Sequence, residues 1–279
     1  MVRSLTTSDA DTTRQLDGSA YLVRAITRAA DVLDCIQHSA GGASLNELVE
    51  RSGLTKPTVF RMVRNLEHTG LVERVPGRDL YRLGLRCVEL GQAYLQQVDY
   101  RREALPVLER LRDSYNETVH LAVLDDNLRV VYLEKLEGKH AIGIMMSRVG
   151  GSAPAYCTGL GKALLAARED DPVARLERDG ELVPKTPNTI CDPHDLRAEL
   201  HRIRGRGYSL DLEEHEVGVR CVAATIHDSG GRVAGALSIA GPAQRLPEDL
   251  LSGELADAVV KAAHEISRRL GSPQAHERL

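Results

Sequence analysis

The stretch Ser44–His68, SLNELVERSGLTKPTVFRMVRNLEH, predicts two short helices joined by a tight turn. Ser44 followed three residues later by Glu47 is a capping box, in which the two side chains satisfy free backbone N–H groups at the start of a helix. Gly53 lies in the turn, and Thr55, with a proline in the first turn after it, opens the second helix. Two short helices joined by a Gly-containing turn are typical of a helix-turn-helix.

The second of these helices has one apolar face and one polar face. Val59, Met62, Val63 and Leu66 recur at helical spacing and predict the buried face. The opposite face carries hydrogen-bond donors with a long reach, since Arg and Lys bind guanine or phosphate and Asn pairs with adenine. By itself this helix fits an ordinary solvated surface and a DNA-reading surface equally well.

The segment after the helix favours DNA. An amphipathic helix from about Tyr21 to His38 precedes the pair, and a Pro-Gly-Arg-Asp turn between Val72–Arg74 and Leu80–Arg82 predicts a hairpin. Three helices followed by a basic hairpin form a winged helix-turn-helix, whose wing contacts phosphate or a minor groove. We therefore predict a DNA interface made of Ser44, Thr55, Lys56, Thr58, Arg61, Arg64, Asn65, Arg74, Arg78 and Arg82.

The charge distribution supports this interface. Between Thr55 and Arg86 there are seven Lys and Arg residues against three acidic residues, a net charge of +4, although the whole chain carries −4. The remainder therefore carries −8. A local basic patch on an acidic protein attracts phosphate at one site and limits indiscriminate binding elsewhere.

The composition is that of a globular protein with room for two domains. The 279 residues are 42% apolar, and their five cysteines are scattered without a CxxC pair, so neither a zinc finger nor a secreted disulfide framework is indicated. The polar residues 1–18 predict a disordered arm, and no apolar run is long enough to span a membrane. We expect a cytoplasmic protein that needs no cofactor or metal.

Residues 19–83 make up the predicted winged-helix domain, and the organisation changes after it. The helical run over residues 84–99 is apolar on more than one side, which favours a linker and dimerisation helix over a plain core helix. Helices and strands then alternate irregularly over residues 100–271, including an expected strand at Ala141–Met146 and one long helix at Glu248–Leu270. This pattern predicts an α+β domain with a tail at 272–279.

Three further blocks of sequence resemble the IclR-type transcriptional regulators. They are Pro154–Ala166 (PAYCTGLGKALLA), the segment from Gly207 to Ala224 with GYSLD and GVRCVAA, and Ala236–Pro242 (ALSIAGP). The resemblance implies a winged helix, a linker helix and a GAF-like effector-binding domain. It also implies dimers or dimers of dimers on operators near genes for catabolism of organic acids, sugar acids or aromatics, with repression the commonest mode.

The same blocks suggest a pocket for a small effector. Thr158-Gly159-Leu160-Gly161 opens a helix, whose free N–H groups attract a carboxylate; the less favoured alternative is that the glycines serve only tight packing. The resemblance places Asp211, Cys221 and Ser238 in the pocket, and Ala240 stands where some relatives have a second serine. The complete set of predicted effector-binding residues is Ile142, Met145, Gly159, Leu160, Asp211, Val219, Cys221, Ser238 and Ala240, with Ile142 and Met145 equally suited to a core.

Enzymatic interpretations find little support. Cys221 and Asp211 lack a histidine fixed by a motif, since His120, His215 and His227 are all candidates, and no Gly-x-Ser-x-Gly occurs. The Gly-x-Gly-Lys block is not a P-loop, and His215-Glu216 lacks the second histidine of a zinc protease. Cys157, Cys191 and Cys221 are too widely spaced to indicate a metal site. We predict a repressor that responds to a small ligand, not an enzyme; the alternative is a small-molecule-binding or enzymatic domain whose winged helix contacts proteins.

Overall fold

The computed structural model describes residues 23–97, 99–139 and 145–272, and the chain divides into two compact units between Gln92 and Ala93. The predicted arm 1–18, the predicted pocket residue Ile142 and residues 273–279 of the predicted tail lie outside the described residues. Each unit is described by itself.

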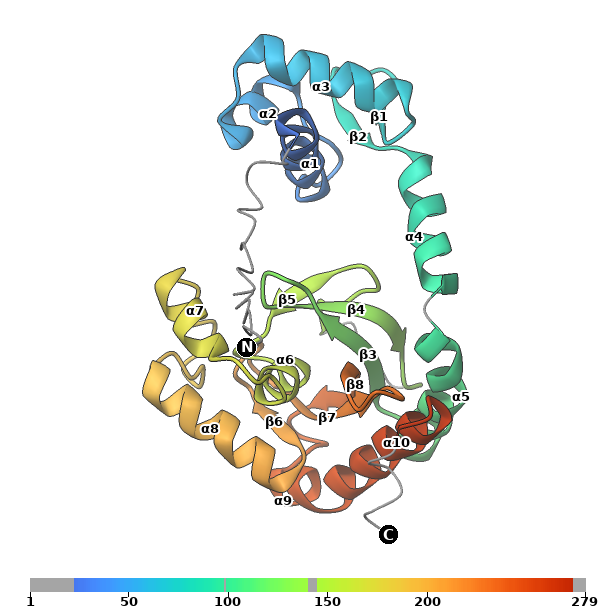
Figure 1. Cartoon of the computed structure of the whole chain (residues 1–279), viewed down its shortest axis with the longest axis vertical. Helices are drawn as coiled ribbons and strands as arrows, with labels where there is room; N and C mark the ends of the chain where they lie inside the picture. The colour runs from blue at the N-terminus through green and yellow to red at the C-terminus, as the bar shows by residue number, and fades with distance from the viewer. Residues whose placement is uncertain (1–22, 98, 140–144, 273–279) are drawn as a thin grey trace, which may run out of the picture. The chain divides into compact units, whose positions relative to one another are not determined.

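The first unit is a winged helix-turn-helix (Figure 1). Its elements are α1 (Arg24–Gln37), α2 (Leu45–Ser52), α3 (Lys56–His68), β1 (Val72–Arg74) and β2 (Tyr81–Leu83). The predicted capping box is present, because the Ser44 hydroxyl accepts from the Glu47 N–H while Glu47 accepts from the Ser44 N–H. Gly53 adopts the left-handed conformation, with φ 64°, that ends α2.

The core of this unit joins all three helices to the hairpin. It contains Val32 of α1, Leu48 of α2, Val63 of α3 and Tyr81 of β2, each at most 2% exposed. A β-bridge between Ala43 and Tyr81 also ties the segment before α2 to the hairpin. The helix pair and its wing are therefore one packed body.

The helix α4 (Leu85–Gln97) follows the hairpin and contains the boundary between the units. Within its described side chains, Leu85, Val88, Leu90 and Tyr94 are each at least half exposed. These four residues, here called the α4 apolar surface, present large apolar side chains to solvent on the described part of the helix.

The second unit is built on a six-stranded antiparallel sheet in the order β5-β4-β3-β8-β7-β6. Its strands are β3 (Thr118–Leu124), β4 (Arg129–Leu136), β5 (Ser152–Pro154), β6 (Ser209–Leu212), β7 (Val219–His227) and β8 (Val233–Pro242). The helices are α5 (Asp99–Tyr115), α6 (Gly159–Ala166), α7 (Pro172–Arg178), α8 (Pro193–Arg206), α9 (Glu248–Leu250) and α10 (Ala256–Arg269). This α+β arrangement agrees with the predicted fold class and is consistent with a GAF-like domain.

Alternate residues of the strands enter two separate cores, because side chains of a strand alternate between its faces. Val222 and Leu237 join the core made with α5 and α10. Ala223 and Ala236 join the core made with α6, α7 and α8. Both faces of the sheet are thus covered by helices (Figure 1).

Two expected elements were wrong in detail. In the expected strand at Ala141–Met146, residues 141–144 lie outside the described residues, and Met145 and Met146 are not in a strand; the short β5 forms later, at Ser152–Pro154. The expected long helix Glu248–Leu270 is interrupted, because Gly253 leaves helical geometry at φ −107°, ψ −107° in a widened turn over Leu251–Leu255. A glycine tolerates such a conformation at low steric cost.

Candidate functional site

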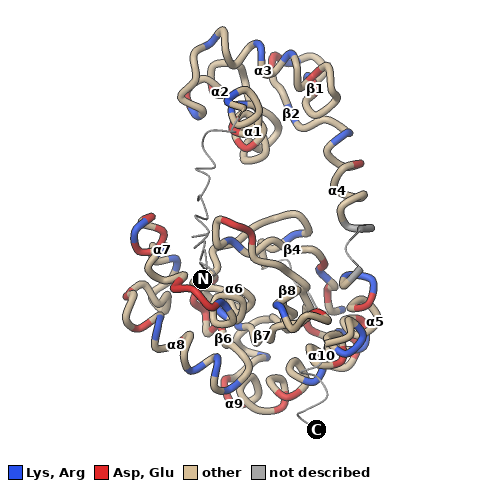
Figure 2. Tube along the Cα trace, viewed as in Figure 1, with Lys and Arg blue, Asp and Glu red and all other residues tan. Residues whose placement is uncertain are grey.

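The polar face of α3 is solvent-exposed, as a reading helix requires. Val59, Val63 and Leu66 are buried under the helix, while Lys56, Arg61, Arg64 and Asn65 are exposed on its outer side. Lys and Arg residues of this unit lie along α2, α3 and the hairpin (Figure 2). Packing and charge are therefore segregated on opposite faces of one short helix.

Most of the predicted DNA-binding side chains have partners within the unit. Lys56 Nζ donates to Asn46 Oδ1 at 3.1 Å, Arg64 pairs with Glu67 at 2.8 Å, and Asn65 Nδ2 donates back to the Arg61 carbonyl at 2.7 Å. The hydroxyls of Thr55 and Thr58 bond each other at 2.9 Å. These contacts are exposed, so solvent screens them and an incoming phosphate or base can replace them at little cost.

The wing arginines differ from one another. Arg74 donates to the Tyr81 hydroxyl at 2.9 Å and its guanidinium lies 5.3 Å from the centroid of that ring, while Arg82 pairs with Glu73 at 2.7 Å. Among the described residues, the guanidinium groups of Arg78 at the tip and of Arg61 on α3 form no hydrogen bond or ion pair with another side chain or the backbone. Of the predicted DNA-binding arginines, Arg61 and Arg78 are thus the two whose guanidinium groups have no partner in the described part of the chain.

A pocket forms in the second unit where the register of the sheet aligns polar residues on one face. His120 of β3 lies opposite Ser238 of β8, and Cys221 of β7 lies opposite both Asp211 of β6 and Ala240 of β8. These residues alternate with core residues such as Leu237, so the pocket occupies the sheet face that α6 covers. Four strands contribute to one small polar surface.

The N-terminus of α6 closes this pocket. A Cβ on Gly159 would lie 2.8 Å from Cys221 Sγ, and a Cβ on Gly161 would lie 2.2 Å from the Ala155 carbonyl oxygen. Both glycines therefore permit close packing, as the alternative interpretation of this motif held. The Thr158 hydroxyl accepts from the Gly161 N–H at 3.2 Å, which leaves the earlier N–H groups of Gly159 and Leu160 without a partner in the helix.

The pocket is small, about 40 Å³ in volume. Its lining combines apolar side chains with convergent polar groups, which is typical of a small-molecule site. The lining residues are His120, Tyr132, Met145, Ser147, Thr158, Gly159, Leu160, Asp211, His215, Glu216, Val219, Cys221, Ser238 and Ala240. A larger hollow beside Ala167, Arg204 and His227 lies at the other end of α6, away from this polar cluster.

Burial shifts the ionisable groups of the pocket toward their neutral forms. It raises the pKa of Asp211 to about 7, a rise that the nearby Lys162 ammonium partly opposes. It lowers the pKa of His120 to about 3, with Lys135 acting in the same direction, so that the imidazole is neutral. His120 Nε2 lies 2.9 Å from Ser147 Oγ, and its Nδ1 lies 3.5 Å from Ser238 Oγ.

The buried cysteines are unsuited to nucleophilic chemistry. Burial, assisted by the charge of Asp211, raises the pKa of both Cys157 and Cys221 to about 12. An activated thiol requires the opposite shift, because the thiolate is the reacting form. The thiol of Cys221 serves instead as part of the pocket wall under Gly159.

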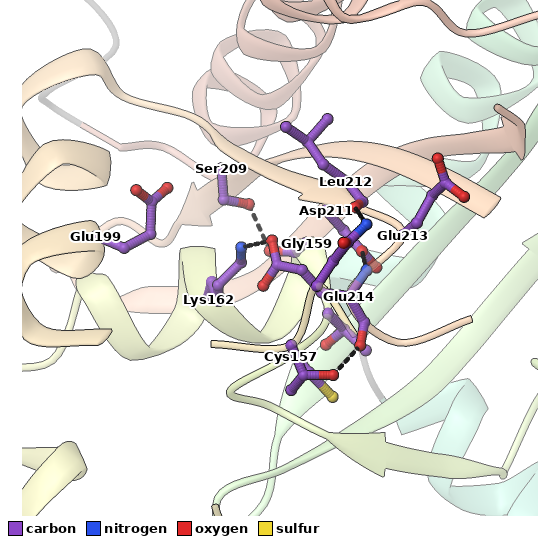
Figure 3. Close-up of polar contacts among 12 residues, drawn as sticks. Cys157, Gly159, Lys162, Glu199, Ser209, Asp211, Leu212, Glu213 and Glu214 are labelled. Atoms are coloured by element: carbon purple, nitrogen blue, oxygen red, sulfur yellow. Dashed lines mark hydrogen bonds and ion pairs between the residues drawn. The ribbon is translucent and has the colours of Figure 1, made fainter. Parts of the chain in front are cut away.

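Behind the pocket, a buried ion pair ties α6 to the loop between β6 and β7. Lys162, 1% exposed, donates to Glu214, and Asp211 accepts from the Glu214 backbone N–H at 2.8 Å (Figure 3). Ser209 donates to the Gly159 carbonyl at 2.5 Å, which fixes β6 to the same end of α6. Lys162 thus links α6 to the loop that carries the lining residues His215 and Glu216.

The comparison with known proteins covers both units. Residues 25–76 match the family model of the IclR helix-turn-helix domain, and residues 92–268 match that of the bacterial transcriptional regulator IclR C-terminal domain. The chain is 32% identical over 250 residues to the transcriptional repressor IclR of Escherichia coli, covering 89% of this chain and 90% of that protein. The chain belongs to the IclR family.

Solved structures agree with this membership. The IclR of Thermotoga maritima superposes with a TM-score of 0.65 at 35% identity, covering 88% of this chain and 98% of that one. An IclR homolog from Microbacterium hydrocarbonoxydans, solved in complex with 4-hydroxybenzoate, gives a TM-score of 0.74 at 27% identity, with 88% and 98% coverage. As an IclR-family member this chain is a transcriptional regulator, with a DNA-binding helix-turn-helix and a domain of the effector-binding type.

The structure brings the predicted pocket residues of this IclR-family chain together. Met145, Gly159, Leu160, Asp211, Val219, Cys221, Ser238 and Ala240 all line the one cavity, and only Ile142 lies outside the described residues. Their role in binding a ligand stays a prediction. The predicted DNA-binding residues all belong to the winged helix or its cap, although the Ser44 hydroxyl already serves the capping box.

Six lining residues were not predicted as part of the pocket: His120, Tyr132, Ser147, Thr158, His215 and Glu216. His120 and His215 entered only as candidates in the enzymatic interpretation. Thr158 had a usable signal, because it opens α6 beside Gly159. The other five residues come from strands and loops that tertiary contacts bring together, and no local sequence pattern predicts those contacts.

The described residues hold one cluster of possible metal ligands, the exposed Asp192, His194 and Asp195 at the start of α8. Asp192 already accepts from the N–H groups of the other two as a helix cap. Cys157, Cys191 and Cys221 do not form such a cluster in the described part of the chain. None of the described helices is both long and apolar enough to span a bilayer.

Proposed function

We propose that this chain represses transcription by binding a DNA operator as a dimer and that a small carboxylate in the pocket of the second unit changes its affinity for the operator. The pocket carries the proposal: polar groups from β3, β6, β7 and β8 converge there on the N-terminus of α6. The repressor IclR of Escherichia coli, similar over most of both chains, supports the sign of regulation.

A carboxylate suits the pocket for electrostatic reasons. The free N–H groups of Gly159 and Leu160 carry the partial positive charge of a helix N-terminus. A protonated Asp211 donates a hydrogen bond to an anion, and the hydroxyls of Ser238 and Ser147 add further donors. The relative solved with 4-hydroxybenzoate binds a carboxylate, which supports the same class here.

The effector is tested by thermal shift with a panel of small mono- and dicarboxylates, each paired with its uncharged amide. A ligand that binds only the folded state raises the melting temperature. The acids should raise the melting temperature of the wild type, and they should raise that of Ser238→Ala less. The amides should leave the melting temperature of both proteins unchanged. Equal stabilisation by acid and amide would contradict a carboxylate site.

Binding to the operator is tested at Arg61. Replacing Arg61 by Ala removes an exposed guanidinium without disturbing the core, so the variant should fold and lose about 5- to 150-fold in operator affinity, the range of one base-reading arginine. Fluorescence anisotropy with a selected operator, repeated at several salt concentrations, measures the loss. Arg178→Ala, an equal change of charge on α7, is the control and should leave the affinity unchanged.

The result separates two roles of Arg61. Loss confined to the operator shows base reading, and an equal loss on random DNA shows phosphate binding. No affinity for any DNA sequence would reject the proposed function in favour of a winged helix that contacts proteins.

A further inference from the structure

The side chain of Phe60 is exposed on α3, at the border between the apolar face and the basic face of that helix. It is the only phenylalanine of the chain, and 46% of it is exposed. Its helical neighbours Val59 and Val63 are fully buried in the core of the first unit. The fold of this unit therefore leaves a large aromatic ring exposed to solvent, at a position where the packing of the unit does not require an apolar side chain.

Charged side chains flank Phe60 along one row of the helix. Lys56 precedes it by four residues and Arg64 follows it by four, and residues at this spacing are neighbours on a helix surface. Arg61 lies beside it on the adjacent row and is exposed. An apolar protein partner suits this row poorly, because the cores of protein interfaces are depleted of charged residues.

DNA suits the same row well. Phosphates attract the lysine and arginines, and the major groove presents one apolar group on a base edge, the C5-methyl of thymine. Phe60 is the fifth residue of α3, and the first half of a recognition helix is the part that contacts base edges. The ring is thus positioned where a thymine methyl is within reach.

We propose that Phe60 selects a thymine in each half of the operator by packing its ring against the C5-methyl group. This inference rests on the proposed function and adds a specificity contact to the basic residues already assigned. Lys56 and Arg64 hold the helix on the backbone, and Phe60 distinguishes thymine from cytosine, which lacks the methyl group.

The experiment removes the methyl group alone. An operator is first selected from random DNA with the full-length wild-type protein, and each thymine is then replaced by deoxyuridine in both half-sites. One replacement should weaken wild-type binding about fourfold per half-site, the equivalent of exposing one methyl-sized group. Anisotropy titrations at fixed salt provide the affinities.

The protein variants complete the cycle. Phe60→Ala should bind the thymine operator about as weakly as the wild type binds the deoxyuridine operator, and it should show no further loss on deoxyuridine at that position. Phe60→Leu keeps an apolar contact and should retain part of the discrimination. Val217→Ala, which shortens another exposed apolar residue in the second unit, should behave as wild type.

The possible outcomes distinguish failure of the proposed role of Phe60 from failure of the proposed function, which is operator binding. Failure to select any DNA sequence would contradict both the proposed function and the role of Phe60. Specific DNA binding in which every thymine tolerates deoxyuridine would overturn the role of Phe60 alone. Undiminished sensitivity of Phe60→Ala at the same thymine would overturn it as well, because another residue would then contact the methyl group.

Discussion

At the scale of single residues, burial makes the ionised form of Asp211 in the pocket energetically unfavourable. Its carboxyl group is 5% exposed, and burial raises its pKa to about 7. The charged and titratable groups around it are Lys162 from α6 and Glu214 and His215 from the loop after β6. Lys162 favours the ionised form, as do the backbone N–H groups of Glu214 and His215. Below pH about 7 the neutral form of Asp211 is therefore favoured in the folded chain.

This cost predicts a pH dependence of stability. Below pH about 4 the carboxyl group is protonated in both the folded and the unfolded chain, so the group contributes no penalty. Between pH about 4 and about 7 only the unfolded chain ionises, and the folded state loses roughly 4 kcal/mol at about 1.4 kcal/mol per pH unit. Above pH about 7 the loss is complete and constant.

The measurement compares wild type with Asp211→Asn in denaturant titrations from pH 4 to 8. The variant should be closest to wild type near pH 4 and should gain relative stability steadily up to pH about 7. Taking the difference cancels the titration of the remaining groups. A difference that stays constant over this range would show that Asp211 is ionised throughout.

At the scale of elements, Lys162 fixes the distance between α6 and the loop that closes the pocket. Lys162 and Glu214 are both nearly inaccessible, and the second carboxylate oxygen of Glu214 has no hydrogen-bond partner among the described residues. Thr189 donates to the Glu214 carbonyl at 2.7 Å, so the loop backbone is anchored separately. The side-chain pair is thus the link that positions the helix relative to the loop.

Breaking one half of this pair should destabilise the second unit strongly. Lys162→Met leaves a buried carboxylate without a partner, and we expect a loss of about 3–5 kcal/mol in free energy of unfolding. The double variant Lys162→Met with Glu214→Gln should recover most of the loss, because neither remaining group is charged. Chemical denaturation monitored by circular dichroism measures both.

The control is Arg175→Met, which breaks the exposed pair between Arg175 and Asp179. It should cost less than about 1 kcal/mol, since solvent screens such pairs. If Lys162→Met costs no more than this control, the buried pair does not hold the loop.

At the scale of the whole molecule, the α4 apolar surface is an expected contact surface for a second polypeptide, because burial of apolar side chains is favourable. Leu85, Val88, Leu90 and Tyr94 are at least half exposed and lie on two sides of the helix. A helix-turn-helix that binds as a pair reads two half-sites about one helical turn apart, which requires a connected dimer. We expect α4 to supply that connection in a second copy of the chain.

Charging this surface should weaken self-association. The double variant Leu85→Glu with Val88→Glu should shift the protein from dimer to monomer by at least tenfold in dissociation constant, because each buried apolar side chain contributes about 1.5–3 kcal/mol. Operator affinity should fall in parallel. Analytical ultracentrifugation over a concentration series measures the shift.

Ala93→Glu adds the same kind of charge to α4 on the side that carries Arg86 and Glu89, and it should leave association unchanged. Unaltered association of the double variant would place the dimer contact on another surface. In that case α4 would be a linker only.

The sequence by itself determined the winged helix, because its signals are local. The Ser44–Glu47 box and the left-handed Gly53 act within a few residues, and the structure reproduces both. The hairpin and the alternation of buried and exposed positions in α3 follow from short-range periodicity in the same way. The three blocks that resemble the family also predicted seven of the fourteen residues that line the pocket.

Tertiary structure decided the rest, because it depends on contacts between distant parts of the chain. Both faces of the sheet are buried, so hydrophobicity does not reveal which face His120 or Tyr132 occupies, and the strand register alone aligns His120 with Ser238. The partner of Lys162 lies 52 residues away, and its burial appears only once α6 packs against the loop. Exposure of Phe60 likewise required the packed unit, since its position on α3 is at the edge of the apolar face.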